Sequence, residues 1–246
     1  MGKAIVFTSG KGGTGKTTAV AAVASCLAAT GHRTLWIDCD LGLGNLDLSL
    51  GIEGASTTNF GDVLAGRVSL TDAVYPHPQI PGLFYLAAPV SVAAEEVSPT
   101  AMGQQVEEAK AAFEFVLLDS AAGIGSAFRL AKGLADMAVI VTTWDASALR
   151  DGQRAAAMLF DAELGEVRLL LHRIRPRLLR DNVITVDDLV DAVGAQLIGI
   201  VPEDSAVGAS VREELALALY GSTGASRAFL RIAKRLAGEH IPLGKI

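Results

Sequence analysis

The segment Ser9–Thr18 reads SGKGGTGKTT. It directly follows the strand-like run Ala4–Thr8, and its last three residues begin the apolar, helix-like stretch Lys16–Ala29. Two nucleotide-binding patterns fit it: the dinucleotide fingerprint GxGxxG and the P-loop pattern GxxxxGK[ST]. A dinucleotide site does not require a cation and a hydroxyl at positions 16 and 17, the last two of the P-loop pattern. A P-loop needs Lys16 for the β- and γ-phosphates and Thr17 for the metal ion. The sequence therefore predicts a P-loop rather than a bare glycine-rich turn.

The glycines of this loop indicate how the phosphates are bound. They let successive backbone N–H groups turn inward as an anion nest, and the positive end of the following helix adds to it. The predicted phosphate-binding residues of the loop are Gly12, Gly13, Thr14, Gly15, Lys16, Thr17 and Thr18.

A second lysine, Lys11, lies inside the loop and makes it the deviant form of the motif, KGGxGKTT. This lysine is poorly placed to fold back on the phosphates of its own subunit. Across a dimer interface it would reach the nucleotide of the partner and act there as an arginine finger does. The alternative, a solvated loop lysine, explains this spacing less well.

Length and composition agree with one large α/β domain. The chain has 246 residues, of which 50% are apolar, and it contains 26 glycines. Seven short runs are almost entirely apolar, as strands buried on both faces are, and helix-like stretches separate most of them. We therefore predict a single domain over residues 1–246, with a doubly wound, mostly parallel sheet of about seven or eight strands between two helix layers. The predicted strands are Ala4–Thr8, Thr34–Asp38, Leu83–Ala87, Phe115–Asp119, Ala138–Thr142, Val167–Leu171 and Leu197–Val201. The predicted helices are Lys16–Ala29, Thr100–Ala112, Leu149–Glu163, Val186–Val193 and Ala225–Ala237, and Pro76–Pro81 is predicted to be a loop.

Charge and cysteine content exclude several classes of protein. Twenty-one Lys and Arg against 27 Asp and Glu give a formal charge of −6, which argues against a general grip on nucleic acid. The two cysteines, Cys26 and Cys39, are too few for a disulfide framework or a four-thiolate metal site. No apolar run reaches the roughly 18 residues of a membrane span, and no signal-peptide pattern precedes the first strand. We expect a cytoplasmic protein.

Three aspartates lie at the ends of predicted strands. Asp119 ends one strand, and Asp38 and Asp40 come at the end of another, two residues apart. Ligands of open α/β sheets bind at the carboxyl ends of the strands. Mg²⁺ prefers one or two carboxylates together with phosphate oxygens and water. We therefore predict a Mg²⁺ site near Thr17 and Asp119.

Four further segments extend the pattern well beyond the P-loop. They are Ile37–Asp47 (IDCDLGLGNLD), Leu117–Ile124 (LLDSAAGI), the stretch from Val141 to Asp151, and Gly199–Asp204 (GIVPED). With the deviant P-loop, they resemble the switch I, Walker B and switch II, partner-helix and PED elements of the MinD/ParA family of ATPases, most closely its septum-site-determining branch. The resemblance implies a P-loop NTPase fold of the SIMIBI type, hydrolysis of ATP with Mg²⁺, and an ATP-dependent homodimer. It further implies a MinC-like inhibitor and a MinE- or DivIVA-linked topological factor as partners.

The resemblance also implies roles for individual residues. Asp40 would position the attacking water, Asp38 would lie near the water shell of the metal ion, and Gly123 would donate its N–H to the γ-phosphate. Lys11 and Lys16 would act on the transferred phosphoryl group. The residues implied at the dimer and partner surfaces are Lys11, Asn45, Arg150 and Asp151. Those implied around the base are His172, Arg173, Pro202, Glu203 and Asp204.

The chain departs from the family at several of these positions. His172 stands where relatives carry the asparagine that contacts adenine; it either keeps that role with altered selectivity or ends a strand at the surface. The stretch Ser226–Leu236 has an apolar and a basic face, and it either docks on the sheet or lies in a membrane interface. We expect it to dock, and we expect the domain to lack the membrane-targeting helix of its relatives. Membrane binding would then need such a helix beyond it, at the inner face of the cell membrane.

The resemblance leaves more than one function open. The first is an ATP-hydrolysing switch that recruits partners to place the division site, with slow turnover unless a partner activates it. The second is a dimeric scaffold that binds ATP and barely hydrolyses it. The third is a flagellar-number or positioning ATPase of the same family, which usually carries an extension before the P-loop strand.

Overall fold

The structure is a computed structural model and describes residues 1–39, 57–88, 98–121, 123, 125, 134–162, 164–181, 183–212, 216–219 and 221–243. Its centre is an eight-stranded sheet in the order β3-β4-β2-β5-β1-β6-β7-β8. The sheet is parallel except for the pair β3–β4. The strands are β1 (Lys3–Thr8), β2 (Thr34–Cys39), β3 (Tyr75–Pro76), β4 (Leu83–Leu86), β5 (Phe115–Ser120), β6 (Met137–Thr142), β7 (Val167–Ile174) and β8 (Gln196–Pro202).

All seven predicted strands are present, and the structure adds an eighth. The two-residue strand β3 pairs antiparallel with β4, so Pro76 belongs to a strand and not to the predicted loop. Proline is tolerated there because β3 forms the edge of the sheet, where one side of the strand needs no N–H donor. The prediction of a mostly parallel sheet of seven or eight strands is confirmed.

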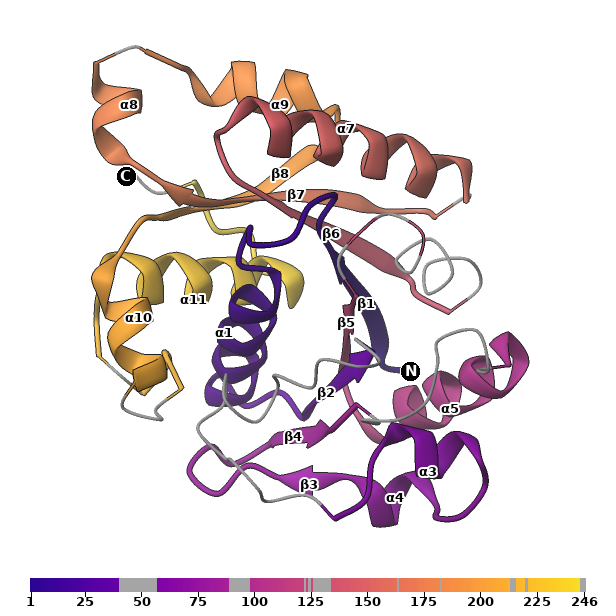
Figure 1. The fold of residues 1–246 in the computed structure, drawn as a ribbon. Helices are drawn as coiled ribbons and strands as arrows, with labels where there is room; N and C mark the ends of the chain where they lie inside the picture. Colours follow the sequence, from indigo (N-terminus) through magenta and orange to yellow (C-terminus); the bar gives the residue numbers. More distant parts are fainter. Residues whose placement is uncertain are drawn as a thin grey trace.

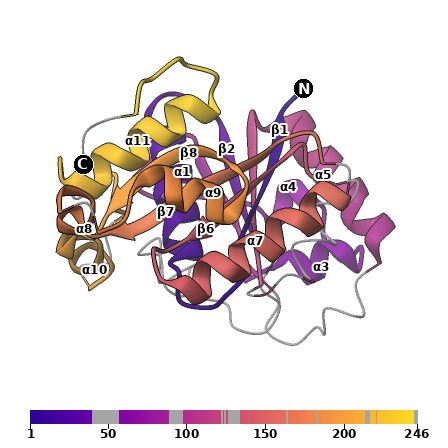
Figure 2. The same cartoon turned by 90° about the horizontal axis from the view of Figure 1, so that it is seen from above.

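Helices cover both faces of the sheet and make three layers (Figure 1, Figure 2). One face is covered by α1 and α11, and the other mainly by α3, α4, α5, α7 and α9. The described helices are α1 (Lys16–Ala29), α3 (Phe60–Leu64), α4 (Leu70–Ala73), α5 (Pro99–Ala112), α7 (Ala146–Asp161), α8 (Pro176–Arg180), α9 (Val186–Val193), α10 (Ser205–Arg212) and α11 (Gly224–Leu236).

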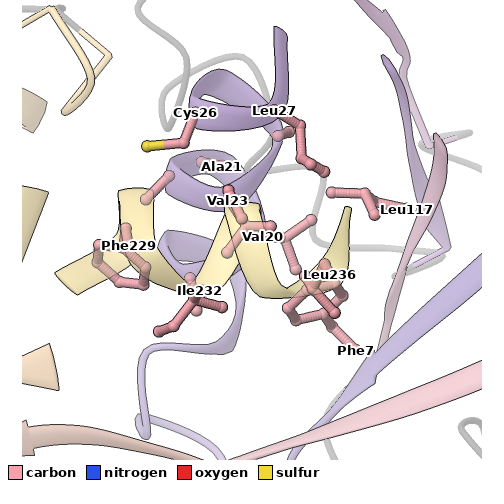
Figure 3. Packing of buried hydrophobic residues seen from close by; sticks show 14 of the residues in the cluster. Phe7, Val20, Ala21, Val23, Cys26, Leu27, Leu117, Phe229, Ile232 and Leu236 are labelled. Atoms are coloured by element: carbon pink, nitrogen blue, oxygen red, sulfur yellow. The ribbon is translucent and has the colours of Figure 1, made fainter. Parts of the chain in front are cut away.

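Helix α1 is buried on nearly all sides because α11 packs across it (Figure 3). Val20, Val23 and Leu27 of α1 join Phe229 and Ile232 of α11 in one apolar cluster with the sheet. Burying side chains of this size stabilises the fold by about 1.5–3 kcal/mol each. The docked interpretation of the amphipathic stretch is therefore confirmed: its apolar face is used against α1 and β8.

The winding of the chain places the carboxyl ends of the central strands together. From β1 the chain moves outward to β2 and β4 and returns to β5; it then crosses to β6, β7 and β8 on the other side of β1. In sheets of this kind the ligand crevice lies at the carboxyl ends of the strands, where the winding reverses. The segment after β1 occupies that place.

Strand β8 forms the edge of the sheet opposite β3, and a side chain of α11 covers it. Arg235 donates from Nη1 to the carbonyl of Ile198 at 2.6 Å, from Nε to Ile241 O at 2.8 Å and from Nη2 to Pro242 O at 2.7 Å. One guanidinium group thus joins the edge strand to the chain that follows α11. Within the described residues, no helix is long and apolar enough to cross a membrane.

Candidate functional site: a P-loop between four strand ends

The glycine-rich loop after β1 has the backbone of an anion nest. Gly13 and Gly15 have φ values of 82° and 88°, which side-chain-bearing residues rarely adopt. Gly15 is the N-cap of α1, and its carbonyl accepts the first helical hydrogen bond, from Ala19 N at 2.9 Å. A Cβ atom on Gly12 or Gly13 would meet no described atom within 4 Å. The loop is thus an open concavity at a helix N-terminus, the arrangement that binds phosphate.

Lys16 and Asp119 form a buried ion pair beneath this loop. Lys16 Nζ contacts Asp119 Oδ1 and lies 3.5 Å from Thr17 Oγ1. The side chains of Lys16 and Asp119 are only 7% and 1% exposed. A charge buried this deeply needs a partner of opposite charge, and Lys16 and Asp119 neutralise each other. The predicted phosphate-binding lysine and the predicted metal-binding carboxylate therefore lie in one site.

A second carboxylate lies beside this pair. Asp38 of β2 is directly opposite Asp119 of β5 in the parallel register, so both leave the sheet at the same edge. Asp38 is also buried. The described residues contain no group of three or more His, Cys, Asp or Glu that could hold a metal ion. A site of one hydroxyl and one or two carboxylates fits Mg²⁺, which takes its remaining ligands from phosphate and water.

Two buried hydroxyls beside the loop support this fit. Thr8 Oγ1 and Thr14 Oγ1 are buried and have no hydrogen-bond partner among the described residues. Buried polar atoms of this kind are normally satisfied by protein, ligand or water. Thr8 ends β1 and Thr14 lies in the loop, so the unpaired hydroxyls concentrate where the phosphates are predicted.

The switch II segment reaches the same loop. Gly123 donates its N–H to the carbonyl of Ser9 at 3.3 Å and has a φ of 100°. The predicted γ-phosphate sensor is thus within hydrogen-bond distance of the loop that would hold the phosphates.

Lys11 is held within its own subunit. Its Nζ donates to Ser147 Oγ at 2.8 Å and lies 3.5 Å from Asp145 Oδ1. Hydrogen bonds from Thr143 and Ser147 hold the pKa of Asp145 below its usual range, so it stays charged at neutral pH. The lysine is about half exposed, but it is not the freely solvated side chain of the alternative prediction.

Sequence reasoning missed Asp145 and Ser147 because the helix was predicted to begin too late. Helix α7 starts at Ala146 and not at Leu149, and Asp145 is its N-cap, accepting from Ala148 N at 3.1 Å. An Asp immediately before an apolar helical stretch is a helix-start signal, and Asp145 before Ala146 offered it in the sequence.

The partner residues predicted on α7 lie next to the loop. Arg150 is exposed, and Asp151 forms an ion pair with Arg154 at 3.5 Å. The backbone of Asp151 packs against Gly10, where an added Cβ would lie 2.3 Å from the carbonyl oxygen. The first turns of α7 and the P-loop are therefore in direct contact.

The structure places His172 under the loop and not at a surface strand end. Its side chain is 2% exposed, so it does not end a strand at the surface; β7 continues to Ile174. Its Nδ1 lies 2.7 Å from Thr14 O, and its ring packs against Phe229. The contact of His172 with the base stays a prediction; in the structure its Nδ1 is engaged by the loop carbonyl.

Arg173 and Glu203 form a charged group beside the loop. Arg173 has a φ of 55°, the one positive value outside glycine among the described residues, and its Nη2 is 3.8 Å from Glu203 Oε1. Arg175 Nε donates to Glu203 Oε2 at 2.8 Å. Left-handed backbone at a residue with a side chain stores strain and often accompanies ligand sites.

The last three predicted base residues, Pro202, Glu203 and Asp204, differ in their contacts. Pro202 and Glu203 line a cavity of about 430 Å³ at the end of β8. Asp204 also borders it, but its carboxylate accepts from Ala206 N and Ala225 N, both at 3.0 Å. Burial would raise the pKa of Asp204, but the hydrogen bonds from Ala225 and Ala206 outweigh burial and lower it. Asp204 thus anchors the start of α11, whereas Pro202 and Glu203 remain predicted base contacts.

Residues 5–217 match the model of the CobQ/CobB/MinD/ParA nucleotide binding domain. The chain belongs to this family. The match includes β1 from Ile5 onward, the P-loop, the ends of β2, β5 and β7 and the first turns of α7; it ends before α11.

Relatives within the MinD/ParA family carry the comparison further. The chain is 36% identical over 244 residues to the septum site-determining protein MinD of Synechocystis sp., which covers 98% of this chain and 92% of the relative. Among solved structures it is similar to the MinC:MinD cell division protein complex of Aquifex aeolicus, with a TM-score of 0.90, 34% identity and 98% of each chain covered. MinD of Pyrococcus horikoshii complexed with Mg-ADP matches with a TM-score of 0.83 and 29% identity over 96% of each chain.

Family membership confirms the predicted fold of a MinD/ParA-type P-loop NTPase. Two of the residues assigned by resemblance, Asp40 and Asn45, lie outside the described residues. Their roles in water positioning and dimerisation stay predictions.

Proposed function

We propose that this chain is an ATP-dependent, dimerising switch ATPase of the MinD type that acts in division-site placement. The observation that carries the proposal is the deviant P-loop with Lys16 and Asp119 paired beneath it. It lies in a fold that matches the MinD of the Aquifex MinC:MinD complex with a TM-score of 0.90.

Nucleotide binding would exchange the partners of this ion pair. Lys16 would turn from Asp119 to the β- and γ-phosphates, which are the stronger negative charges in the loop. Asp119 would then hold Mg²⁺ together with Thr17 and Asp38. The Mg²⁺ ion would neutralise charge on the phosphate oxygens. The nest N–H groups would fix the phosphates, and Gly123, now on Ser9 O, would turn its N–H to the γ-phosphate.

Dimerisation would require Lys11 to leave Ser147 and Asp145. Because these contacts are about half exposed, their net strength is small, and a triphosphate on a partner subunit is a stronger acceptor. Asp40 would then orient the attacking water. We propose that hydrolysis is slow until a partner bound at the first turns of α7 acts through the packed Gly10–Asp151 contact.

The partners follow from the relatives. Since the Aquifex protein is solved as a MinC:MinD complex, we propose a MinC-like inhibitor for this chain, with a MinE- or DivIVA-linked factor as the activator. The protein would act in the cytoplasm, and at the inner face of the cell membrane where a membrane-targeting helix is joined to this domain.

The experiment is Mg-ATP titration followed by light scattering and single-turnover hydrolysis. ATP binding, an ATP-dependent dimer and phosphate release support the proposal. A dimer that forms but releases no phosphate, with or without activator, favours the ATP-binding scaffold instead. Absence of ATP binding rejects both.

A further inference from the structure

The imidazole of His172 touches the P-loop from below. Its Nδ1 lies 2.7 Å from the carbonyl oxygen of Thr14, and the ring is 2% exposed. Gly15 lies directly over the ring, since a Cβ added there would come within 2.4 Å of both Nδ1 and Cε1. The ring of Phe229, from α11, packs against the imidazole on another side, with 5.8 Å between the two ring centroids. His172 therefore fills the space between the loop and the core.

The state of the ring follows from its surroundings. Burial lowers the pKa of His172, and the neighbouring charge of Arg173 lowers it further, so the imidazole is neutral at physiological pH. A neutral imidazole carries one proton, and a carbonyl oxygen can only accept. The proton is therefore on Nδ1, which donates to Thr14 O, and Nε2 is an acceptor.

This hydrogen bond fixes the direction of a neighbouring N–H. The chain has no cis peptide bond among its described residues, and in a trans peptide the C=O and the following N–H point in opposite directions. Thr14 C=O points down to His172, so Gly15 N–H points away from the core. Gly15 is the N-cap of α1, so its N–H precedes the hydrogen bonds of the helix.

We propose that His172 is a positioning residue of the phosphate site: by holding the Thr14 carbonyl, it aims the Gly15 N–H at the phosphates. This inference rests on the proposed nucleotide binding and replaces the role of His172 as a base contact. Preorganised N–H donors bind an anion more tightly because they need no rearrangement when the charge arrives. The close approach explains why position 15 has no room for a side chain.

Base-free tripolyphosphate separates a loop-positioning residue from a base contact. His172→Phe keeps an aromatic ring and removes the donor. We expect Mg-ATP and Mg-tripolyphosphate to lose affinity by the same factor, roughly five- to tenfold, as for loss of one hydrogen bond. His172→Gln, whose amide N–H can donate to Thr14 O, should recover most of the tripolyphosphate affinity. The control is His32→Phe, an aromatic substitution of the histidine that pairs with Glu114, and it should change neither affinity.

Loss of ATP affinity with unchanged tripolyphosphate affinity in His172→Phe would overturn the inference and restore the base contact. A second measurement needs only the wild-type chain and covers the case of a variant that does not fold. The Gly15 amide proton should shift downfield in ¹H–¹⁵N spectra when tripolyphosphate binds. A Gly15 resonance that does not move would equally reject the inference. If wild-type protein binds neither ligand, the proposed function fails instead.

Discussion

Lys11 donates to Ser147 Oγ of its own subunit at 2.8 Å, at the start of the helix that carries Arg150 and Asp151. The lysine that would cross a dimer interface is therefore held in cis. The same contact joins the P-loop to a surface predicted to bind partners. Dimerisation, which needs Lys11 to leave this contact, would thus uncover part of the surface predicted to bind partners.

Ser147→Ala should favour the ATP-bound dimer. The variant removes the 2.8 Å hydrogen bond that holds Lys11, so less free energy is lost when the lysine leaves. We expect the dimer to form at a protein concentration a few-fold lower, in line with one exposed hydrogen bond. Light scattering in Mg-ATP checks it. In a Lys11→Ala/Ser147→Ala double variant the gain should vanish; if it persists, Ser147 does not act through Lys11.

Lys16→Ala should lose ATP affinity by roughly a hundredfold, because the β- and γ-phosphates lose their charged donor inside the loop. Titration calorimetry measures the loss. Lys3→Ala is the matched control: Lys3 lies at the other end of β1 and pairs with Glu166 at 3.1 Å. Equal ATP affinity in the two variants would remove Lys16 from the site.

Asp40→Ala should bind ATP with nearly wild-type affinity and accumulate as the dimer. The carboxylate is assigned to the attacking water and not to the nucleotide, so only turnover should be lost. Phosphate release and light scattering on one sample separate the two effects. Wild-type turnover would exclude Asp40 from the mechanism.

Gly10→Ala and Gly12→Ala should differ in stability although both lie in the loop. A Cβ at Gly10 would lie 2.3 Å from the backbone of Asp151, whereas one at Gly12 meets no described atom within 4 Å. We expect Gly10→Ala to lower the free energy of unfolding by about 1–3 kcal/mol, as overpacking does, and Gly12→Ala to change it little. Denaturant titration without nucleotide compares them. Equal stabilities would show that the loop does not pack on α7.

Tyr75 should lose its hydroxyl proton at a lower pH than an ordinary tyrosine. Hydrogen bonds from the side chains and backbone N–H groups of Thr57 and Thr58 to its hydroxyl oxygen lower the pKa of Tyr75 to about 8. The folded state then releases this proton before the unfolded state does, so the contribution of Tyr75 to stability rises between about pH 8 and pH 10. Absorbance at 295 nm should show a step near pH 8. Its persistence in Tyr75→Phe would assign the step to another group.

The fold could be predicted because its signals are local. The bounds of α1 and α9 agree with the sequence pattern to the residue, since a glycine-rich loop opens the first and Thr185 caps the second. β3 was missed because two residues carry no periodicity, and their pairing with β4 depends on where the chain returns. The phosphate loop and Asp119 followed from motif and strand-end position, and Asp38 from the resemblance; the pairing of Asp38 opposite Asp119 became visible only in the strand register.

The position of His172 could not be predicted because its partner is distant in the chain. A polar pair after Leu171 indicates that a strand ends, and here the strand continues because Thr14, 158 residues away, supplies an acceptor. The partners of Lys11 were missed for a similar reason: they lie 134 and 136 residues further on, and only packing of α7 against Gly10 brings them near.

The guanidinium of Arg235 affects whether crowded copies of this protein can aggregate through the edge strand β8. An edge strand presents unpaired carbonyl and N–H groups, and crowded copies can add strands to one another there and aggregate. Arg235 donates a hydrogen bond to the carbonyl of Ile198 and holds residues 241 and 242 beside β8 through hydrogen bonds to their carbonyls. Pro242 has no N–H with which to template a further strand. At high local concentration, copies of the protein should therefore not join sheet to sheet through β8.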